Sequence, residues 1–422
     1  MKILRIRGGI PLVGEAEVSG AKNAALPILA ATLLVRAPIE LSGVPEIGDT
    51  AEMLTLLSMR GVLVRRIGKG RYLLDASDAE ASDLVIPGDG RLRGSLYLLG
   101  AGLAAFGRSS VGVPGGCQLG ERPFDLHLLA LRALGAVAFE SEGRLFAKAE
   151  SLHGAEIRLA YPSVGATVNA ILAALGAKGR SVIYGAAREP HIVDLIRFLI
   201  SCGASIRIGA DGEIVVSGGE RLSGTDYRIM PDMIEAGSYL LMAASTRGDL
   251  LLRRAPLGQL GALFPLLRET GCELTPLGDD LIRLRMRSRP RPISVQTEPY
   301  PGFPTDLHPP LAAYLSLGSG ESRITETVFK DRFRYREGLS AFGAHLSLAD
   351  KTACIQGRDR LCGARVSAPD LRAAAAYLTA ALAAEGESIL CHAELLYRGY
   401  ETPLFKLRRL GAVISDGDAL SV

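Results

Sequence analysis

The sequence predicts an α/β protein of two domains, each assembled from three copies of one repeated unit. One pattern recurs six times along the 422 residues: an apolar helical stretch, a glycine, an Ala, Val or Cys, and an alternating segment. Such regular recurrence is the signature of repeated structural units. The repeat glycines, separated by 74, 68, 68, 72 and 68 residues, are Gly61, Gly135, Gly203, Gly271, Gly343 and Gly411.

Each unit combines a helix with a strand in a way that its residues explain. A glycine placed just after a helix usually adopts the left-handed backbone conformation that ends the helix. The segment that follows alternates between apolar and polar residues, as a strand does. The spacing of 68 to 74 residues leaves room for two helices and several short strands. Six such units divide into two domains of three, with helices and sheets in layers.

The first 21 residues read as two strands that precede the first unit. We expect these strands to complete the second domain. The predicted domains are therefore residues 22–230, and residues 1–21 together with 231–422, with chain crossings near Lys22 and Met230. A ligand site is expected in the cleft between two such lobes.

The composition argues against several functional classes. Apolar residues make up 48% of the chain and charged residues 22%, which is usual for globular proteins. The net charge is only +3, there is no Trp, and the densest basic run, residues 283–291, reads as a strand and turn with a solvated face. Without aromatic stacking platforms or a basic patch, no nucleic-acid partner is expected.

Cysteine and histidine spacing gives no sign of a metal or redox site. The six cysteines form no C-x-x-C pair, and the six histidines show no ligand spacing. The start of the chain lacks the apolar run of a signal peptide. The longest uncharged stretch, Leu159–Ala177, contains Pro162 and Asn169 and cannot span a membrane. We expect a soluble cytoplasmic protein with free thiols and no membrane partner.

The first segment whose residues could take part in binding or catalysis is Ser19–Pro27, a Ser/Gly turn that leads into an apolar helix. Lys22 and Asn23 would lie at the helix N-terminus, where free N–H groups and the helix dipole attract anions. Pro27 fits this interpretation only if it lies in the first helical turn. The alternative, a solvated Lys and an Asn cap, remains equally open from the spacing alone.

The second segment is the glycine-rich loop Ser109–His127, which carries Cys117 at its centre. A free Cys is usually a small buried hydrophobe, but a glycine-rich loop offers no core in which to bury it. We therefore favour a functional thiol, with the charge of Arg122 close by for an anion. The remaining cysteines lie in apolar patterns and are expected in the core: Cys202, Cys272, Cys354, Cys362 and Cys391.

The third segment is Glu298–Asp306, which three prolines make rigid and non-helical. It would present Thr305 and Asp306 at its end, where Asp306 could cap the following helix or act as a base; the local pattern alone favours capping. Four arginines stand alone in turns, and each taken singly is expected to be a surface charge: Arg93, Arg332, Arg372 and Arg398.

Taken together, these segments resemble the enolpyruvyl transferases that act on UDP-N-acetylglucosamine in bacterial peptidoglycan synthesis. The resemblance covers essentially the whole chain, and the motifs occur in the order of that family. The related shikimate enzymes share the fold but lack the loop PGGC. The resemblance implies two inside-out α/β barrels, each of three βαβαββ units, with a cleft between them. The motifs are SGAKNAALPILAATLL, PGGCQLGERPFDLH, PSVGAT, AAREP, FPTD, ITETVF, DLRA and RGYE.

The resemblance also implies a reaction, in which the enolpyruvyl group of phosphoenolpyruvate moves to the 3-hydroxyl of the sugar and phosphate leaves. Cys117, on a lid, would protonate the substrate's methylene carbon and be the target of fosfomycin. Asp306 would accept the hydroxyl proton. Lys22, Asn23, Arg122 and Arg398 would hold phosphoenolpyruvate, with Lys22 and Arg398 counted as catalytic. No metal or cofactor is expected, because Lys and Arg supply the positive charge. The implied nucleotide-sugar contacts are Asn23, Arg93, Arg122, Pro123, Phe124, Asp125, Leu126, Ser163, Val164, Gly165, Asp306 and Val328.

Four positions depart from the family pattern. Gly48, His191, His308 and Tyr397 stand where Lys, an acidic residue, Gln and Asp are usual. These changes leave the acid and the base in place but leave the acceptor open. One alternative is a paralogue that acts on another nucleotide or nucleotide sugar in specialised metabolism. Another is an inactive homologue that regulates a partner, which predicts the loss of Cys117 or Asp306; both are present.

Overall fold

A computed structural model describes residues 1–80, 92–113 and 124–418 of the chain. The described residues form two compact units. One unit contains residues 1–19 and 231–418, and the other contains the described part of residues 20–230. The chain crosses from one unit to the other between Ser19 and Gly20 and again between Met230 and Pro231.

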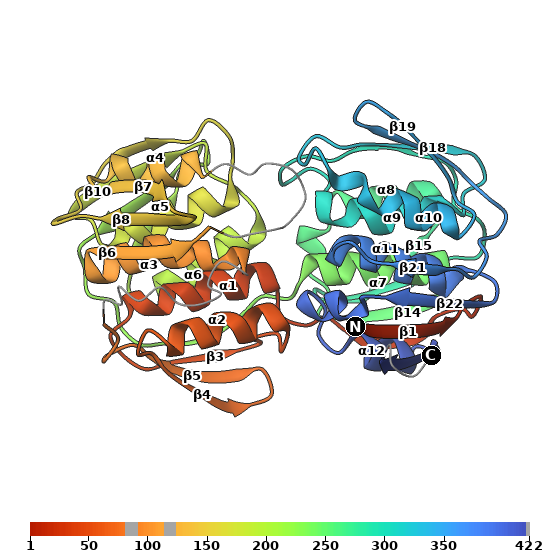
Figure 1. Ribbon diagram of the computed structural model, residues 1–422, viewed down its shortest axis with the longest axis horizontal. Coiled ribbons are helices and arrows are strands. Elements are labelled where there is room, and N and C mark those ends of the chain that lie inside the picture. The colour runs from red at the N-terminus through yellow and green to blue at the C-terminus, as the bar shows by residue number, and fades with distance from the viewer. Residues whose placement is uncertain (81–91, 114–123, 419–422) are drawn as a thin grey trace. The chain divides into compact units, whose positions relative to one another are not determined.

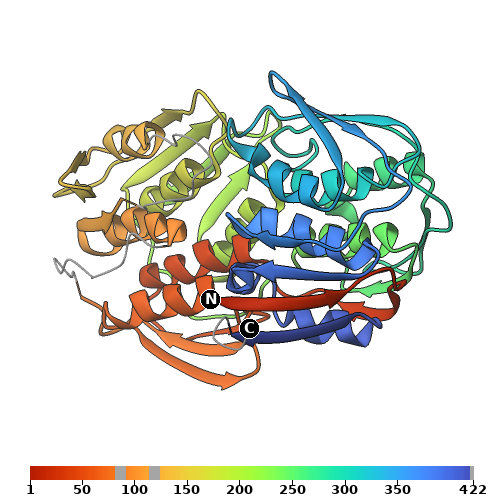
Figure 2. The same ribbon diagram turned by 45° about the vertical axis from the view of Figure 1, so that its right-hand side comes forward.

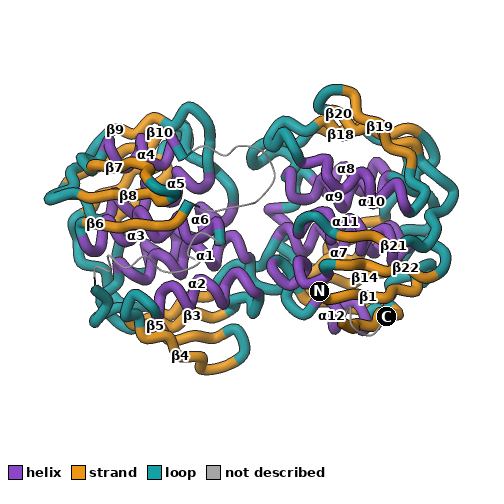
Figure 3. Tube along the Cα trace, in the orientation of Figure 1, coloured by secondary structure: helices purple, strands orange, loops and turns teal. Residues whose placement is uncertain are grey.

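Each unit is an inside-out α/β barrel, with helices inside and sheets outside (Figures 1 and 3). In the unit of residues 231–418, three buried helices pack against one another: α7 (Met233–Ser245), α9 (His308–Leu315) and α11 (Leu371–Ala383). In the other unit, α3 (Tyr97–Phe106) packs against α1 (Lys22–Ala31) and α5 (Val164–Leu175). Helices that are apolar on all sides belong in such interiors.

A second helix in each repeat is amphipathic and buries only one face. These outer helices are α2 (Gly48–Ser58), α4 (Asp125–Ala133), α6 (Pro190–Ser201), α8 (Leu263–Thr270), α10 (Arg336–Ala341) and α12 (Pro403–Arg409).

No helix in the described ranges is both long and apolar enough to cross a membrane.

The strands show the repeated βαβαββ order most clearly in residues 156–218. β9 (Glu156–Arg158) runs parallel to β10 (Gly179–Tyr184), and the hairpin of β11 (Ser205–Ile208) and β12 (Ile214–Gly218) adds antiparallel strands. Helix α5 lies between the first two strands in sequence, and α6 follows them. The same unit also contains a sheet of β3 (Ile39–Ser42), β4 (Leu63–Gly68), β5 (Arg71–Asp75) and β13 (Asp226–Arg228), and one of β6 (Arg108–Gly112), β7 (Val137–Ser141) and β8 (Arg144–Lys148).

The other unit has three four-stranded sheets with the same arrangement, a parallel pair extended by antiparallel strands. The first contains β2 (Val13–Glu17), β14 (Asp249–Arg253), β15 (Glu273–Pro276) and β16 (Leu281–Arg285). The second contains β17 (Ser294–Gln296), β18 (Glu321–Thr325), β19 (His345–Ala349) and β20 (Thr352–Gln356). The third contains β1 (Lys2–Arg7), β21 (Arg365–Ser367), β22 (Glu387–Cys391) and β23 (Val413–Asp418).

Both strands from the start of the chain complete sheets of this unit. β1 lies between β22 and β23 and is antiparallel to both, and Figure 2 shows the red β1 beside the dark blue β23. β2 runs parallel to β14. A buried ion pair fixes the chain just after β2: Lys406 Nζ donates to Glu235 Oε1 and to Ser19 Oγ, both at 2.6 Å, and the Ser19 N–H donates to Glu235 Oε2 at 2.6 Å.

The six repeat glycines confirm the predicted helix ends. Each follows the second helix of its unit, and all six have φ between 83° and 107°. A side chain is strained in this left-handed region, so glycine is the residue that lets the chain turn from helix into strand.

The expectation for Pro27 is wrong. Pro27 lies in the interior of α1, five residues after its first residue, rather than in the first turn. The helix continues without the hydrogen bond that an N–H at this position would have given to the carbonyl of Asn23. Burial of eight of its ten residues offsets this cost by tertiary packing.

The core prediction holds for three of the five described cysteines. Cys202, Cys272 and Cys391 are buried, whereas Cys354 is half-buried and Cys362 is exposed. The prediction fails for Cys362 because this residue lies in the link before β21, where it forms an isolated β-bridge with Glu385, rather than inside a strand. Cys117 lies outside the described residues.

A buried polar contact joins three helices of the unit formed by residues 20–230. Asn169 in α5 accepts a hydrogen bond from the Gly100 N–H of α3 at 2.8 Å, and its side-chain N–H donates to the Leu96 carbonyl at 3.0 Å and to His127 Nδ1 of α4 at 2.8 Å. His127 Nδ1 is therefore an acceptor, and its hydrogen is on Nε2. Burial lowers the pKa of His127 to about 4, and the charge of Arg93 acts in the same direction.

This buried histidine should make stability depend on pH. Its folded pKa of about 4 lies below the ordinary value of 6.5. Between these pH values the unfolded chain binds the proton and the folded chain does not. The contribution of His127 to the free energy of unfolding is therefore complete above pH 6.5 and is lost as pH falls toward 4. The loss should reach about 3 kcal/mol. Denaturant unfolding across this pH range should show that the free energies of unfolding of the wild type and His127→Gln differ less as pH falls. A constant difference would contradict the assignment.

Candidate functional site

A half-buried carboxylate clamped by two buried arginines is the most distinctive charged cluster of the unit that contains residues 231–418. Asp306 lies in the short helix η4 (Thr305–Leu307), directly before α9. Its Oδ1 accepts from Arg332 Nη2 and its Oδ2 from Arg372 Nη2, both at 2.6 Å. The arginine side chains are only 2% and 8% exposed. The expectation that these two arginines are surface charges is therefore wrong, because each is buried against a carboxylate.

The arginines come from two different elements. Arg332 opens η5 (Arg332–Tyr335), and Arg372 lies in the first turn of α11, whose N-terminus Asp370 caps. Burial disfavours the cationic form of Arg372, but the negative charge of Asp306 outweighs it and raises the pKa of Arg372 above its usual value. Two cations on opposite oxygens hold the carboxylate in one orientation.

Next to this clamp lies a carboxylate that is buried, Glu326, which accepts from four hydrogen-bond donors. Thr305 Oγ1 donates to its Oε2 at 2.9 Å, and His308 Nδ1 lies 2.8 Å from the same oxygen. The backbone N–H groups of Val328 and Phe329 donate to Oε1 at 2.8 and 3.0 Å. Burial alone would raise the pKa of Glu326, but the contact with His308 and these backbone bonds outweigh it and lower the pKa.

His308 connects Glu326 to a buried tyrosine. Burial lowers the pKa of His308, so the imidazole is neutral near pH 7. Its Nε2 lies 2.8 Å from Tyr335 Oη, and burial raises the pKa of Tyr335, which keeps the hydroxyl protonated. The hydrogen on His308 is therefore on Nδ1, where it donates to Glu326, and Nε2 accepts from Tyr335.

Two further residues of interest lie at the end of η6 (Ala393–Arg398). Arg398 is exposed. Tyr397 is half-buried, and the ammonium group of Lys2 lies 4.8 Å from the centre of its ring.

The unit of residues 20–230 places Lys22 and Asn23 at the first two positions of α1, as predicted. Lys22 Nζ donates to Asp49 Oδ2 at 3.2 Å, and their side chains are 14% and 7% exposed. Asp49 follows Gly48 in the first turn of α2. The ammonium group of Lys22 is thus held by a neighbouring carboxylate at the start of a helix.

Other expected residues of this unit gather around His127. The guanidinium of Arg93 lies 5.8 Å from the ring centre of Phe124, and that ring meets His127 edge-on at 6.3 Å. Gly165 lies so close to His127 that a Cβ there would be 2.7 Å from the ring, so only glycine fits.

Ser163 caps α5 by accepting from the Ala166 N–H at 3.4 Å, and Val164 is the first residue of that helix. Asp125 and Leu126 begin α4. His191, one of the four departures, lies in the first turn of α6. Arg122 and Pro123 lie outside the described residues.

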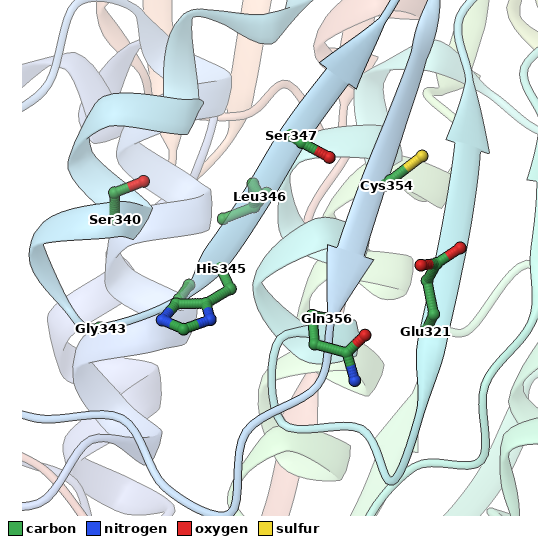
Figure 4. A pocket seen from close by; sticks show the side chains of 9 residues that line it. Glu321, Ser340, Gly343, His345, Leu346, Ser347, Cys354 and Gln356 are labelled. Atoms are coloured by element: carbon green, nitrogen blue, oxygen red, sulfur yellow. The ribbon is translucent and has the colours of Figure 1, made fainter.

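A surface hollow of about 500 Å³ lies over β18, β19 and β20, but it does not suit an anionic substrate. Figure 4 shows Glu321, His345 and Cys354 among its lining side chains, with neither Lys nor Arg among them. None of the expected site residues lines it. In the ranges that the structure describes, no group of three His, Cys, Asp or Glu could hold a metal ion.

Sequence reasoning missed Glu326 and Asp49 and undervalued Arg332 and Arg372. One signal was available for Arg372, because it is the single charge in the otherwise apolar helix LRAAAAYLTAALA, and such a charge requires a partner. No sequence pattern distinguishes Glu326 from a solvated acidic residue, because two of its four donors, Thr305 and His308, are distant in sequence.

Comparison with known proteins assigns the chain to a family. The family model described as EPSP synthase (3-phosphoshikimate 1-carboxyvinyltransferase) matches residues 6–407. UDP-N-acetylglucosamine 1-carboxyvinyltransferase 1 of Carboxydothermus hydrogenoformans is 43% identical over 411 residues, which cover 97% of each chain. UDP-N-acetylglucosamine 1-carboxyvinyltransferase of Granulibacter bethesdensis is 42% identical over 418 residues, covering 98% of this chain and 99% of the relative.

Solved structures agree on the fold. The crystal structure of the enolpyruvyl transferase NikO from Streptomyces tendae is 26% identical with a TM-score of 0.90, and the match covers 99% of both chains. An EPSP synthase structure from Acinetobacter baumannii is 19% identical with a TM-score of 0.78, covering 99% of this chain and 100% of the other. The chain therefore belongs to the EPSP synthase family of enolpyruvyl transferases, and its relatives at 42–43% identity are UDP-N-acetylglucosamine 1-carboxyvinyltransferases.

Proposed function

We propose that this protein transfers the enolpyruvyl group of phosphoenolpyruvate to the 3-hydroxyl of UDP-N-acetylglucosamine and releases phosphate, a step that commits the sugar to peptidoglycan synthesis. The supporting observation is the partly exposed Asp306 carboxylate held between the buried Arg332 and Arg372, in a chain whose relatives carry this activity in their names. A small-molecule phosphate ester and a nucleotide sugar are the only partners that the reaction needs.

The reaction requires one base and one acid. The hydroxyl oxygen adds to the central carbon of phosphoenolpyruvate while the methylene carbon gains a proton. The adduct then loses phosphate and one methyl proton, which restores the double bond. We assign the base to Asp306, because an ionised carboxylate held in one orientation can accept the hydroxyl proton. We assign the acid to Cys117.

Phosphoenolpyruvate carries several negative charges and needs fixed cations around it. We assign these contacts to Lys22, Asn23, Arg122 and Arg398. Lys22 suits this role because it lies at a helix N-terminus, where the backbone also favours anions. Asp49 orients the ammonium group by accepting its hydrogen bond.

Most of the described residues that we assign to the nucleotide sugar lie at or near the starts of helices. In the unit of residues 20–230 the assigned residues are Arg93, the stretch 122–126, and Ser163 to Gly165. Of these, Arg93, Phe124 and Gly165 gather around His127. In the other unit they are Asp306 and Val328. Glu326 links the two, because it accepts from the N–H of Val328 and from the hydroxyl of Thr305, the residue before Asp306. Asn23 completes the set.

The substrate pair should be necessary and sufficient for turnover. Phosphate release, measured with phosphoenolpyruvate and a panel of nucleotides and nucleotide sugars, should require UDP-N-acetylglucosamine. If phosphate is released only with a different acceptor, the protein is a paralogue that acts on that acceptor, an alternative consistent with the departures at Gly48 and Tyr397. No release with any acceptor would favour a regulatory homologue.

Replacing Asp306 with Asn keeps its shape but removes the proposed base. Turnover should fall roughly a hundredfold or more, the usual contribution of a general base. Asp249→Asn is the matched control, because Asp249 is also gripped by two arginines, Arg283 and Arg285, each at 2.7 Å, and lies in β14 outside the proposed site. If Asp306→Asn and Asp249→Asn both retain normal turnover, Asp306 is structural only.

The proposed acid makes a chemical prediction for Cys117. A thiol with an ordinary pKa of about 8.5 can protonate carbon, whereas a Ser hydroxyl is far too weak an acid. Cys117→Ser should lose most turnover, and Cys117→Asp should keep a substantial part with an optimum at lower pH. Fosfomycin should alkylate the wild-type protein at Cys117 only, as read by mass spectrometry, and should spare Cys117→Asp. Exposed Cys362 is the internal control; labelling there instead would overturn the assignment.

A further inference from the structure

We infer that Glu326 is a positioning residue for Asp306, and that His308 fixes Glu326 in the orientation that this role requires. The inference rests on the proposed function, in which Asp306 is the base. It adds two residues that do not touch the substrate but determine where the base points.

A continuous series of hydrogen bonds connects Tyr335 to Asp306. Tyr335 donates to His308, and His308 donates to Glu326 Oε2, each at 2.8 Å. Thr305 Oγ1 donates to the same Glu326 oxygen at 2.9 Å and accepts from Arg332 Nε at 3.0 Å. Arg332 then donates through Nη2 to Asp306 at 2.6 Å. Glu326 thus orients the Thr305 hydroxyl. This hydroxyl accepts from the Arg332 guanidinium, which in turn orients Asp306.

Burial makes this series rigid. His308 is fully buried, Tyr335 is 1% exposed and Glu326 is 2% exposed. The edges of Phe333 and Tyr335 pack on the imidazole, each at 5.3 Å between ring centres. Because water cannot replace a lost partner here, a change at one end must move the neighbouring groups or leave a buried polar atom without a partner.

The two oxygens of Glu326 serve different neighbours, and this separates its effects. Oε2 faces Thr305 and His308 and thereby the base. Oε1 accepts from the N–H groups of Val328 and Phe329 and holds the turn that carries a proposed nucleotide-sugar contact. Loss of His308 should therefore disturb the hydrogen bonds of Glu326 Oε2, which lead to Asp306. It should leave the bonds from the Val328 and Phe329 N–H groups to Oε1 in place.

Substitutions at His308 distinguish positioning from packing. A Gln side chain can donate through its amide N–H to Glu326 and accept from Tyr335 with its carbonyl, so His308→Gln preserves the series. His308→Leu fills the space but can do neither. Glu326→Gln replaces one acceptor oxygen with a donor that faces two other donors, so the series breaks at its centre.

The test measures kcat and the KM for UDP-N-acetylglucosamine in these three variants. We expect His308→Leu to lower kcat by on the order of ten- to a hundredfold with little change in KM, as a small misplacement of a reacting group does. His308→Gln should retain most of the activity, and Glu326→Gln should lose kcat and also raise KM. Tyr314→Phe is the control, because Tyr314 is equally buried and its hydroxyl donates to Thr270, away from Asp306.

The outcomes distinguish a failure of the positioning role of Glu326 and His308 from a failure of the proposed function. If the wild type turns over and His308→Leu matches His308→Gln or Tyr314→Phe in kcat, the positioning role is wrong. A crystal structure of Glu326→Gln gives a reading that does not depend on activity, and it should show Arg332 displaced from Asp306. An unchanged contact of 2.6 Å between these residues would overturn the inference even if the substrates prove to be different.

Discussion

The ion pairs of Asp306 with Arg332 and Arg372 are the interaction on which the proposed site in the unit of residues 231–418 depends. Two nearly buried guanidinium groups are tolerable only because a carboxylate lies between them, and removal of one partner would leave a buried charge uncompensated. The same contacts join η4, η5 and α11, which are distant in sequence. Stability and chemistry therefore share one cluster, and the substrate would meet a base whose orientation is already fixed.

The repeated architecture explains where the expected functional residues lie. Lys22 and Asn23 begin α1, Ser163 caps α5, and Asp306 lies in η4, which directly precedes α9. Arg372, which the sequence did not single out as functional, is in the first turn of α11. These are ends of inner helices, where unpaired N–H groups favour anions. A protein whose proposed substrates both carry phosphate benefits from one structural unit that supplies such an end in every repeat.

Much of the fold follows from short-range rules, whereas much of the site does not. The spacing of the six glycines and the alternation after them depend on local backbone preferences, so the sequence alone predicts the helix-to-strand turns correctly. Pro27 and Cys362 were mispredicted because tertiary packing in one case and an irregular link in the other override local pattern. The partners of Asp306 could not be identified from spacing. Arg332 looks like a surface charge until the fold buries it, and the apolar helix around Arg372 indicates that this residue needs a partner but not which one.

A double-mutant cycle between Asp306, the proposed base, and its clamp tests this account most directly. Turnover would be measured for the wild type, Asp306→Asn, Arg332→Met and the double variant. If Arg332 acts by holding Asp306, each single substitution should lower kcat and the double variant should be little worse than Asp306→Asn, because the two residues act as a unit. If the losses simply add in free energy, the two residues act independently, and the clamp does not position the base.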